Sequence, residues 1–280
     1  KIMSREVVVV SGVRTAVGTF GGALKDQPPT RLAAQVVREA VSRAGVAPDT
    51  IGHVVFGHVI NTEPRDMYLA RVAAIDGGLP QEVPALTLNR LCGSGLQAIV
   101  SASQAIMLGD ADAAVAGGAE VMSRGPHLMP AARWGQRMGD TGMTDMMLGA
   151  LHDPFENIHM GVTAENVAAK WGITREDQDE LAVISHQRAA AAIAAGYFKD
   201  QILPIEMTTR KGTVVFDTDE HGRAEANVAD LQKLRPVFKR DNGTVTAGNA
   251  SGVNDGASAV VLMEAEAAAR AGAKPLARLV

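Results

Sequence analysis

The chain has 280 residues, of which 46% are hydrophobic and only 4% aromatic, and its formal net charge is -4 at pH 7. This acidic balance argues against a protein that mainly binds nucleic acid or an anionic membrane. The single cysteine excludes an intrachain disulfide framework. No apolar run approaches the roughly 20 residues that are needed to cross a bilayer. The N-terminus also lacks the basic segment followed by an apolar run that is typical of a secretory signal. We therefore expect a soluble cytoplasmic protein with a large aliphatic core.

Strands and helices are predicted to alternate over the first 120 residues. Apolar runs indicate strands at 6–10, 53–60, 83–91 and 111–116, and helical spacing indicates helices at 31–44, 66–75 and 96–108. Thr30 is a candidate cap for the first helix, which Gly45 should end, and Gly117 should end the last strand. A glycine-rich loop at 11–22 lacks the spacing of a dinucleotide site. The alternation predicts a mostly parallel sheet with helices on both faces.

The stretch from Asn89 to Ala98 carries the single cysteine, Cys92, where a strand is expected to turn into a helix. Gly93 and Gly95 are expected to adopt dihedral angles that a Cβ would forbid. A helix N-terminus presents unpaired N–H groups and about half a positive charge, which favours a thiolate and leaves donors beside any oxyanion formed there. A buried, inert cysteine is the common alternative. The strand, turn and helix setting favours a nucleophile.

Composition changes after residue 120. Residues 122–155 are rich in methionine, glycine, proline and arginine, which suits either a lid over a flexible ligand or a subunit interface. Helices are predicted at 162–171 and from the capping box at Thr174 to Gly196, and a hairpin arm at 211–217. We interpret the region 121–250 as an insertion into the sheet domain.

A second dense loop of small and polar residues, 248–256, precedes an apolar strand at 257–263 and a helix-forming run to 271. Residues 277–280 have the character of a further strand. Because an isolated strand buries little surface and leaves backbone groups unpaired, we expect the sequence to continue beyond Val280.

Four segments together resemble the thiolases, most of all the biosynthetic acetyl-CoA acetyltransferases of bacterial polyhydroxyalkanoate pathways. They are Arg-Thr-Ala-Val-Gly at 14–18, Asn-Arg-Leu-Cys-Gly-Ser-Gly at 89–95, His-Met-Gly at 159–161 and Gly-Asn-Ala-Ser-Gly at 248–252. The resemblance runs in order along essentially the whole chain.

The resemblance implies an α/β fold of the duplicated, layered αβαβα type. Residues 1–120 with 251–270 would form the N-terminal core domain, and 121–250 a loop domain that binds coenzyme A. Residues 271–280 would only begin the C-terminal core domain, so that half of the fold would be truncated. The resemblance also implies a homotetramer, with a tetramerisation loop at 126–139.

The implied reaction is acyl transfer between coenzyme A thioesters, with no metal and no cofactor other than the coenzyme A of the substrate. The Cys92 thiolate would take an acyl group from one acyl-CoA, and a second acyl-CoA, deprotonated at its α-carbon, would attack it to give 3-oxoacyl-CoA. Thiolysis is the reverse. Thiolases also use Gly-His-Pro, Cys-x-Gly and Asn-Glu-Ala-Phe motifs, which do not occur here. We expect them further along the sequence or on a separate chain, and expect these 280 residues alone to be inactive.

Seven residues are expected to contact coenzyme A by the same resemblance: His159, Met160, Leu151, Ala247, Gly248, Ser251 and Arg223. His159 is expected to touch the pantetheine arm and not to take the proton of Cys92. Small residues would let the backbone approach a narrow ligand, and Ser251 could bond to an amide of it. The alternatives are an ordinary turn before a strand and, for Arg223, a solvent-facing arginine in place of a contact to the adenine or phosphate end.

Three functions remain open at this point. The first is a short-chain 3-oxoacyl-CoA thiolase that uses Cys92. The second is a decarboxylating condensing enzyme of the ketosynthase type, which also places a cysteine between a strand and a helix. The third is a coenzyme A-binding or oligomerising fragment without turnover.

Overall fold

The computed structural model describes residues 5–210 and 212–280. The chain divides into two compact units. Unit 1 consists of Lys1–Pro126, Gln201–Thr218 and Asn254–Val280, and unit 2 of His127–Asp200 and Asp219–Val253. Residues 201–218, which the sequence analysis placed with the loop domain, thus belong to unit 1. The functional roles of the domains remain predictions.

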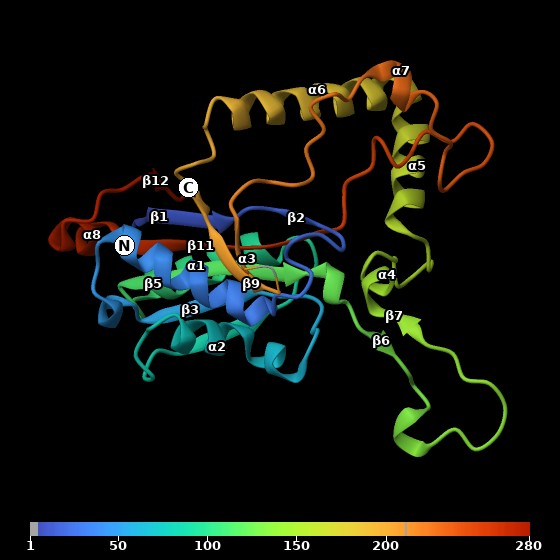
Figure 1. Cartoon of the computed structure of the whole chain (residues 1–280). Helices are drawn as coiled ribbons and strands as arrows, with labels where there is room; N and C mark the ends of the chain where they lie inside the picture. Colours follow the sequence, from blue (N-terminus) through green and yellow to red (C-terminus); the bar gives the residue numbers. More distant parts are fainter. Residues whose placement is uncertain (1–4, 211) are drawn as a thin grey trace. The chain divides into compact units, whose positions relative to one another are not determined.

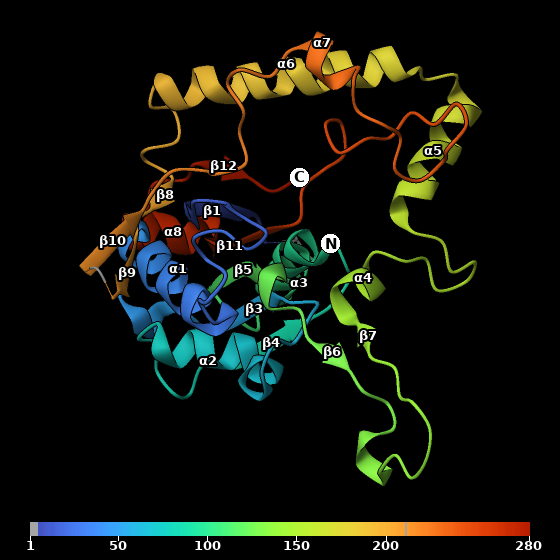
Figure 2. The same cartoon turned by 45° about the vertical axis from the view of Figure 1, so that its right-hand side comes forward.

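Unit 1 is built on a mixed sheet with the main strand order β12-β1-β11-β5-β3-β4 (Figure 1 and, for β4, Figure 2). The strands are β1 (Val7–Thr15), β3 (His53–Gly57), β4 (Ala85–Leu88), β5 (Ala113–Val121), β11 (Asn254–Glu264) and β12 (Ala277–Arg278), and the short β2 (Gly18–Thr19) and β8 (Ile202–Leu203) pair with β11 and β1. Strand β3 is parallel to β4 and β5, as predicted. Strand β11, however, lies antiparallel between β1 and β5, and β12 is also antiparallel to β1, so the prediction of a mostly parallel sheet was wrong. The right-handed crossover rule applies to connections between parallel strands, so it does not constrain this antiparallel strand.

Helices cover both faces of this sheet, which confirms the prediction (Figure 2). They are α1 (Pro29–Ala44), α2 (Leu69–Asp76), α3 (Ser94–Leu108) and α8 (Ala265–Ala271). Leu262 of β11 packs in one buried cluster with Ala98 and Ala102 of α3. The neighbouring Val261 pairs with Ser11, whose hydroxyl donates a hydrogen bond to the Ala40 carbonyl of α1 at 2.6 Å. Because successive side chains alternate across a strand, α1 and α3 lie on opposite faces.

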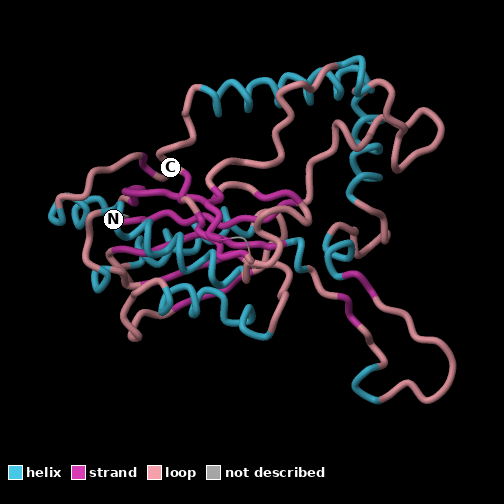
Figure 3. The backbone as a smooth tube through the Cα atoms, in the orientation of Figure 1, coloured by secondary structure: helices cyan, strands magenta, loops and turns pink. Residues whose placement is uncertain are grey.

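Unit 2 contains helices joined by long irregular segments, drawn in pink in Figure 3. Its elements are β6 (His127–Leu128), β7 (Thr144–Asp145), α4 (Met146–Ala150), α5 (Met160–Trp171), α6 (Arg175–Ala194) and α7 (Val228–Leu231). Helix α5 ends at Gly172 in the left-handed conformation, and α6 begins with the predicted capping box between Thr174 and Asp177. The predicted hairpin arm is β9 (Ile205–Thr209) paired with β10 (Gly212–Phe216) in unit 1, and Lys211 of that prediction lies outside the described residues.

Several predicted boundaries were wrong for local reasons. Thr30 does not cap α1, because the helix already begins at Pro29, whose fixed φ suits the first helical position. Strand β1 continues to Thr15 through the expected loop. Strand β5 continues through Gly117, where a Cβ would lie 2.2 Å from the Ser258 carbonyl oxygen of β11. Glycine there permits close strand packing and does not end the strand.

One segment of the described chain, Leu91–Leu108, is long and apolar enough to cross a membrane by length and composition alone. The expectation of no such segment was therefore wrong by this measure. Its residues Ala98, Ala102 and Ile106 are fully buried in unit 1. In all, 33% of the segment is buried, so one face of α3 packs on the sheet and the other is exposed.

The N-terminus of α3 rests directly on the backbone of β3. A Cβ at Gly57 would lie 2.7 Å from the carbonyl carbon of Ser94 and 3.0 Å from the Gly95 nitrogen. Backbone atoms of a helix end cannot move aside as a flexible side chain can. Gly57 therefore sets the distance between the sheet and the start of α3.

We predict that Gly57→Ala destabilises the protein by about 1–3 kcal/mol, because the new methyl group overlaps the α3 backbone. Urea unfolding checks this. Gly95→Ala is the matched control, since a Cβ there meets nothing within 4 Å and alanine favours the helix. Equal stability of Gly57→Ala and the parent protein would contradict the close contact.

Candidate active site

Cys92 lies in the turn between β4 and α3, as predicted, and it is exposed. Ser94, the first residue of α3, ties this turn together. Its hydroxyl donates to the Leu91 carbonyl at 2.6 Å and accepts from the Arg90 N–H at 2.8 Å. The turn therefore presents the cysteine on a backbone that is fixed from both sides.

The strained residue of the turn is Leu91 and not a glycine. Leu91 has a φ of 49°, in the left-handed region, whereas Gly93 has a φ of -86° that any residue adopts. Gly95 is part of α3 and is not among the positive-φ glycines of the described chain. The prediction for these two glycines was wrong, because the chain reverses one residue earlier. A non-glycine residue at positive φ costs on the order of 1–3 kcal/mol and is most common at functional sites.

The start of α3 provides an electropositive environment for the Cys92 sulfur. Within the described chain, no side chain caps this helix, whose N-cap residue is Gly93. The first N–H groups of a helix have no intrahelical partner, and they carry the positive end of the helix dipole. Cys92 is exposed one residue before this N-cap. The Gly93 and Ser94 N–H groups already donate to the Arg90 and Leu91 carbonyls at 3.1 and 3.0 Å, so donors for an oxyanion would come from the N–H groups that follow in the first turn of α3.

In unit 2, His159 is the N-cap residue of α5. Its Nδ1 accepts a hydrogen bond from the Gly161 N–H at 3.0 Å. The ring stacks on Phe238 with centroids 4.7 Å apart, and the edge of His152 approaches it at 5.1 Å. Phe238 was not predicted. The one sequence signal for this contact is the glycine at position 161, where a Cβ would lie 2.0 Å from the Phe238 ring.

Burial, followed by the charge of His152, lowers the pKa of His159 from its ordinary value of 6.5. The imidazole is therefore neutral at neutral pH. A neutral ring that accepts at Nδ1 carries its proton on Nε2 and can donate from there. This suits a contact to a polar ligand, as the sequence analysis expected for His159.

The structure brings Leu151 together with His159 and Met160. The Met160 N–H donates to the Leu151 carbonyl at 2.8 Å, and His152 and His159 form an isolated β-bridge. Met160 remains 42% exposed. These three predicted contacts therefore form one group at the start of α5.

The remaining predicted contacts lie elsewhere in unit 2. Ala247 and Ser251 are exposed, and between them Gly248 packs so closely that a Cβ would lie 2.6 Å from Leu234. Arg223 is also exposed, and its backbone N–H donates to Nδ1 of His186 at 3.3 Å. Cys92 belongs to unit 1 and these seven residues to unit 2. Their roles in binding remain predictions.

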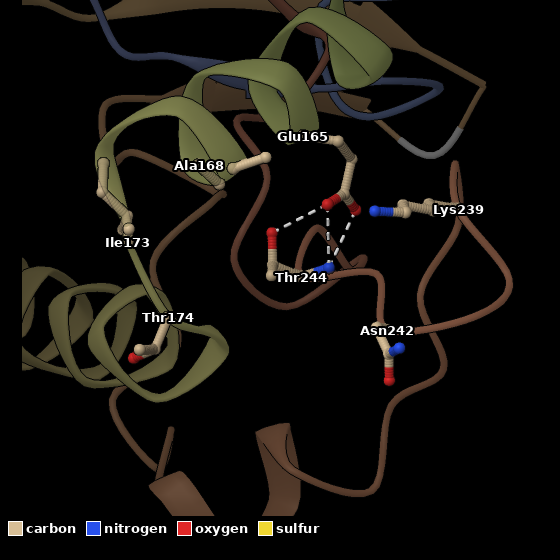
Figure 4. Close-up of a pocket in the computed structure, with 9 residues that line it drawn as sticks. Glu165, Ala168, Ile173, Thr174, Lys239, Asn242 and Thr244 are labelled. Carbon is tan, nitrogen blue, oxygen red and sulfur yellow. Dashed lines mark hydrogen bonds between the residues drawn. The ribbon is translucent and has the colours of Figure 1, made fainter.

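A separate hollow of about 280 Å³ opens in unit 2 between the end of α5 and a loop that contains Thr244 (Figure 4). Its lining residues are Glu165, Ala168, Ala169, Gly172, Ile173, Thr174, Lys239, Asn242 and Thr244. Figure 4 shows the Glu165 carboxylate turned toward Thr244, with which it forms hydrogen bonds. The predicted site residues are not part of this lining as described.

Comparison with known proteins places the chain among enzymes of one family. The family model described as "Thiolase, N-terminal domain" matches residues 7–266. The chain is 69% identical to the beta-ketothiolase BktB of Cupriavidus necator and 49% identical to the acetyl-CoA acetyltransferase of Allochromatium vinosum. Each match covers 99% of this chain and 71% of the relative.

Solved structures show the same relationship. The acetyl-CoA acetyltransferase of Bacillus anthracis superposes with a TM-score of 0.96 at 46% identity, over 100% of this chain and 71% of that one. Human mitochondrial 3-ketoacyl-CoA thiolase in complex with CoA superposes with a TM-score of 0.92 at 43% identity, over 98% of this chain and 68% of that one.

We predict that His159 titrates below pH 6.5, the ordinary value for histidine. Because the unfolded chain binds this proton more readily than the folded one, His159 is expected to lower stability as the pH falls below 6.5. NMR titration of the His159 ring protons measures the midpoint. The substitution His152→Asn should raise this midpoint, since the charge of His152 is one of the causes of the lowered pKa of His159. A midpoint at or above 6.5 in the parent protein would contradict the half-buried, neutral ring.

Proposed function

Since the chain belongs to the thiolase family, we propose that it is an acyltransferase that condenses two short-chain acyl-CoA molecules to 3-oxoacyl-CoA and free CoA. The reverse reaction is thiolysis. The observation that carries the proposal is the exposed Cys92 immediately before the uncapped N-terminus of α3. The matches to beta-ketothiolase and acetyl-CoA acetyltransferases support it independently of this geometry.

In the first half-reaction, the Cys92 thiolate attacks the thioester carbonyl of one acyl-CoA. The carbonyl π electrons move to oxygen, and the resulting oxyanion lies near the N–H groups that begin α3. When the carbonyl forms again, the carbon–sulfur bond to coenzyme A breaks and CoA leaves as a thiolate. Cys92 then carries the acyl group as a thioester.

In the second half-reaction, a base removes the α-proton of another acyl-CoA. The carbanion attacks the acyl carbon on Cys92, a carbon–carbon bond forms, and the Cys92 thiolate leaves. Electrons balance without an oxidant or reductant. The proposal accordingly includes no cofactor and no metal, and coenzyme A takes part as substrate and product.

The proposed coenzyme A contacts are the seven predicted residues of unit 2. The neutral His159 ring and the adjacent Met160 suit the polar and apolar parts of a pantetheine arm. Exposed Ala247 and Ser251 leave room for the same narrow ligand. Arg223 supplies a cation for the anionic end of coenzyme A.

We further propose a homotetramer that works in the cytoplasm and supplies 3-oxoacyl-CoA for bacterial polyhydroxyalkanoate synthesis. The support for the pathway is the sequence resemblance alone. The support for self-association is the predicted tetramerisation loop, 126–139, whose side chains Trp134 and Met138 are each 87% exposed. Large apolar side chains exposed to this degree are typical of interaction surfaces.

Cys92→Ser is expected to reduce acyl transfer to background, because a serine hydroxyl is far less ionised than a thiol in the same turn. When the three remaining thiolase motifs are supplied, on the same or a separate chain, an intact-mass spectrum after exposure to acetyl-CoA should show one acetyl group on the parent protein. Circular dichroism serves as the control that the variant is folded. Turnover retained by Cys92→Ser would refute the assignment of the nucleophile.

The same spectrum separates the alternatives. A parent protein that binds coenzyme A but is never acetylated would favour a binding fragment without turnover. Condensation that requires a malonyl thioester would favour a decarboxylating enzyme of the ketosynthase type.

Replacing both Trp134 and Met138 with serine is expected to convert tetramers into smaller species, which sedimentation velocity resolves. Trp171→Ser is a matched control, since this tryptophan is also exposed in unit 2, at 70%, but lies outside the loop. An unchanged sedimentation coefficient for the double variant would argue against the loop as the tetramer contact.

A further inference from the structure

Two carboxylates of unit 2 are buried and take no part in the proposed acyl transfer. Asp179 of α6 is fully buried, and Glu165 of α5 is 6% exposed. Burial of an ionised carboxylate is costly unless hydrogen bonds or an opposite charge compensate for it. The hydrogen-bond partners of these two carboxylates therefore identify the segment that they hold in place.

Asp179 holds the loop that contains Ala247 and Gly248. One carboxylate oxygen accepts from Nε of Arg175 at 2.7 Å, and the other accepts from Nδ2 of Asn249 at 2.9 Å. Asn249 lies one residue after Gly248 and two before Ser251. The buried charge of α6 thus acts on the centre of the predicted coenzyme A loop.

Asn249 passes this constraint to its neighbours. Its Oδ1 accepts from the Thr246 N–H at 2.8 Å, and its Nδ2 also donates to the Thr244 carbonyl at 2.9 Å. The Thr246 hydroxyl in turn accepts from the Gly248 N–H at 3.1 Å. Every polar atom of the Asn249 side chain is engaged in shaping the segment from Thr244 to Gly248.

Glu165 holds the beginning of the same segment. Its carboxylate accepts from the Thr244 N–H and the Val245 N–H at 2.9 Å each, and from the Thr244 hydroxyl at 2.9 Å. Burial raises the pKa of Glu165, but the hydrogen bonds from Val245 and Thr244 outweigh it and the pKa is lowered. The group is therefore ionised at neutral pH.

Glu165 also links this segment to His159. Both residues belong to α5, where His159 is the N-cap and Glu165 lies in the helix. A helix is stiff over this distance. Its hydrogen bonds therefore tie the segment 244–251 to the helix that carries His159 and Met160.

We propose that Asp179 and Glu165 are positioning residues for coenzyme A, which fix the segment 244–251 in its binding conformation through Asn249, Thr244 and Val245. The inference deepens the proposed function and rests on its assignment of this segment to coenzyme A. Neither carboxylate needs to touch the ligand. Their contribution is to order the loop before binding, so that binding itself costs less conformational entropy.

The test compares Asp179→Asn with Glu180→Gln, which alters the adjacent, exposed carboxyl of the same helix. In Asp179→Asn an amide replaces one acceptor oxygen and opposes a donor of Arg175 or Asn249. Calorimetric titration with coenzyme A should show a dissociation constant raised on the order of tenfold, and hydrogen exchange should accelerate at the amides of 244–251. Glu180→Gln should change neither.

Glu165 provides a graded version of the same test. Glu165→Gln retains an oxygen for the two backbone N–H groups, and its amide can donate to the Thr244 hydroxyl. It should keep most of the affinity, whereas Glu165→Leu should lose it. If the negative charge of Glu165 were itself required, Glu165→Gln would lose coenzyme A affinity as Glu165→Leu does. Affinity retained by Glu165→Gln therefore indicates that the hydrogen bonds are what matters.

Thr246→Val removes only the hydroxyl that accepts the Gly248 N–H and is used if Asp179→Asn does not fold. Unchanged exchange at 244–251 in these variants would overturn the positioning role. Faster exchange with unchanged coenzyme A affinity would overturn its connection to binding. If the parent protein does not bind coenzyme A, the proposed function fails, while the exchange measurement still decides whether the carboxylates order the segment.

Discussion

The contact between the α3 backbone and the glycine at the end of β3 constrains the position of Cys92. Gly57 leaves no room for a side chain, since a Cβ would be 2.7 Å from Ser94. Gly118 of the neighbouring β5 is also close, since a Cβ there would lie 3.3 Å from the Gly57 carbonyl oxygen and at an ordinary contact distance of 3.8 Å from the Gly95 Cα. The chain must therefore leave β4, reverse and enter the helix within a few residues. The left-handed conformation of Leu91 makes this reversal and presents the cysteine.

Features with local causes could be predicted from the sequence. The end of α3 at Gly109, the end of α5 at Gly172 and the capping box at Thr174 all follow from residues adjacent to the boundary. The position of Cys92 between a strand and a helix has the same local origin. Features set by distant contacts were not predicted. Gly117 continues a strand because β11 approaches it, and no neighbour in the sequence indicates that.

The coenzyme A residues illustrate the same limit. The resemblance to thiolases identified His159, Met160 and the loop around Gly248, but not the side chains that hold them. Phe238, which stacks on His159, and Asp179, which holds Asn249, lie about 70–80 residues from their partners. Phe238 is an apolar ring and Asp179 a helix carboxylate, and neither is distinctive in the sequence. Only the fold shows what these two side chains contact.

The antiparallel position of β11 has a consequence for folding during synthesis. This strand forms the middle of the sheet and pairs Glu264 with Val7, near opposite ends of the chain. About 130 residues separate the end of β5 from its start. At about 5–20 residues per second, a ribosome needs on the order of ten seconds for that interval. Throughout it, β1 and β5 expose unpaired edges, which are templates for aggregation. The strand that completes the core is thus made long after its partners, so nascent chains depend on protection of those edges until it emerges.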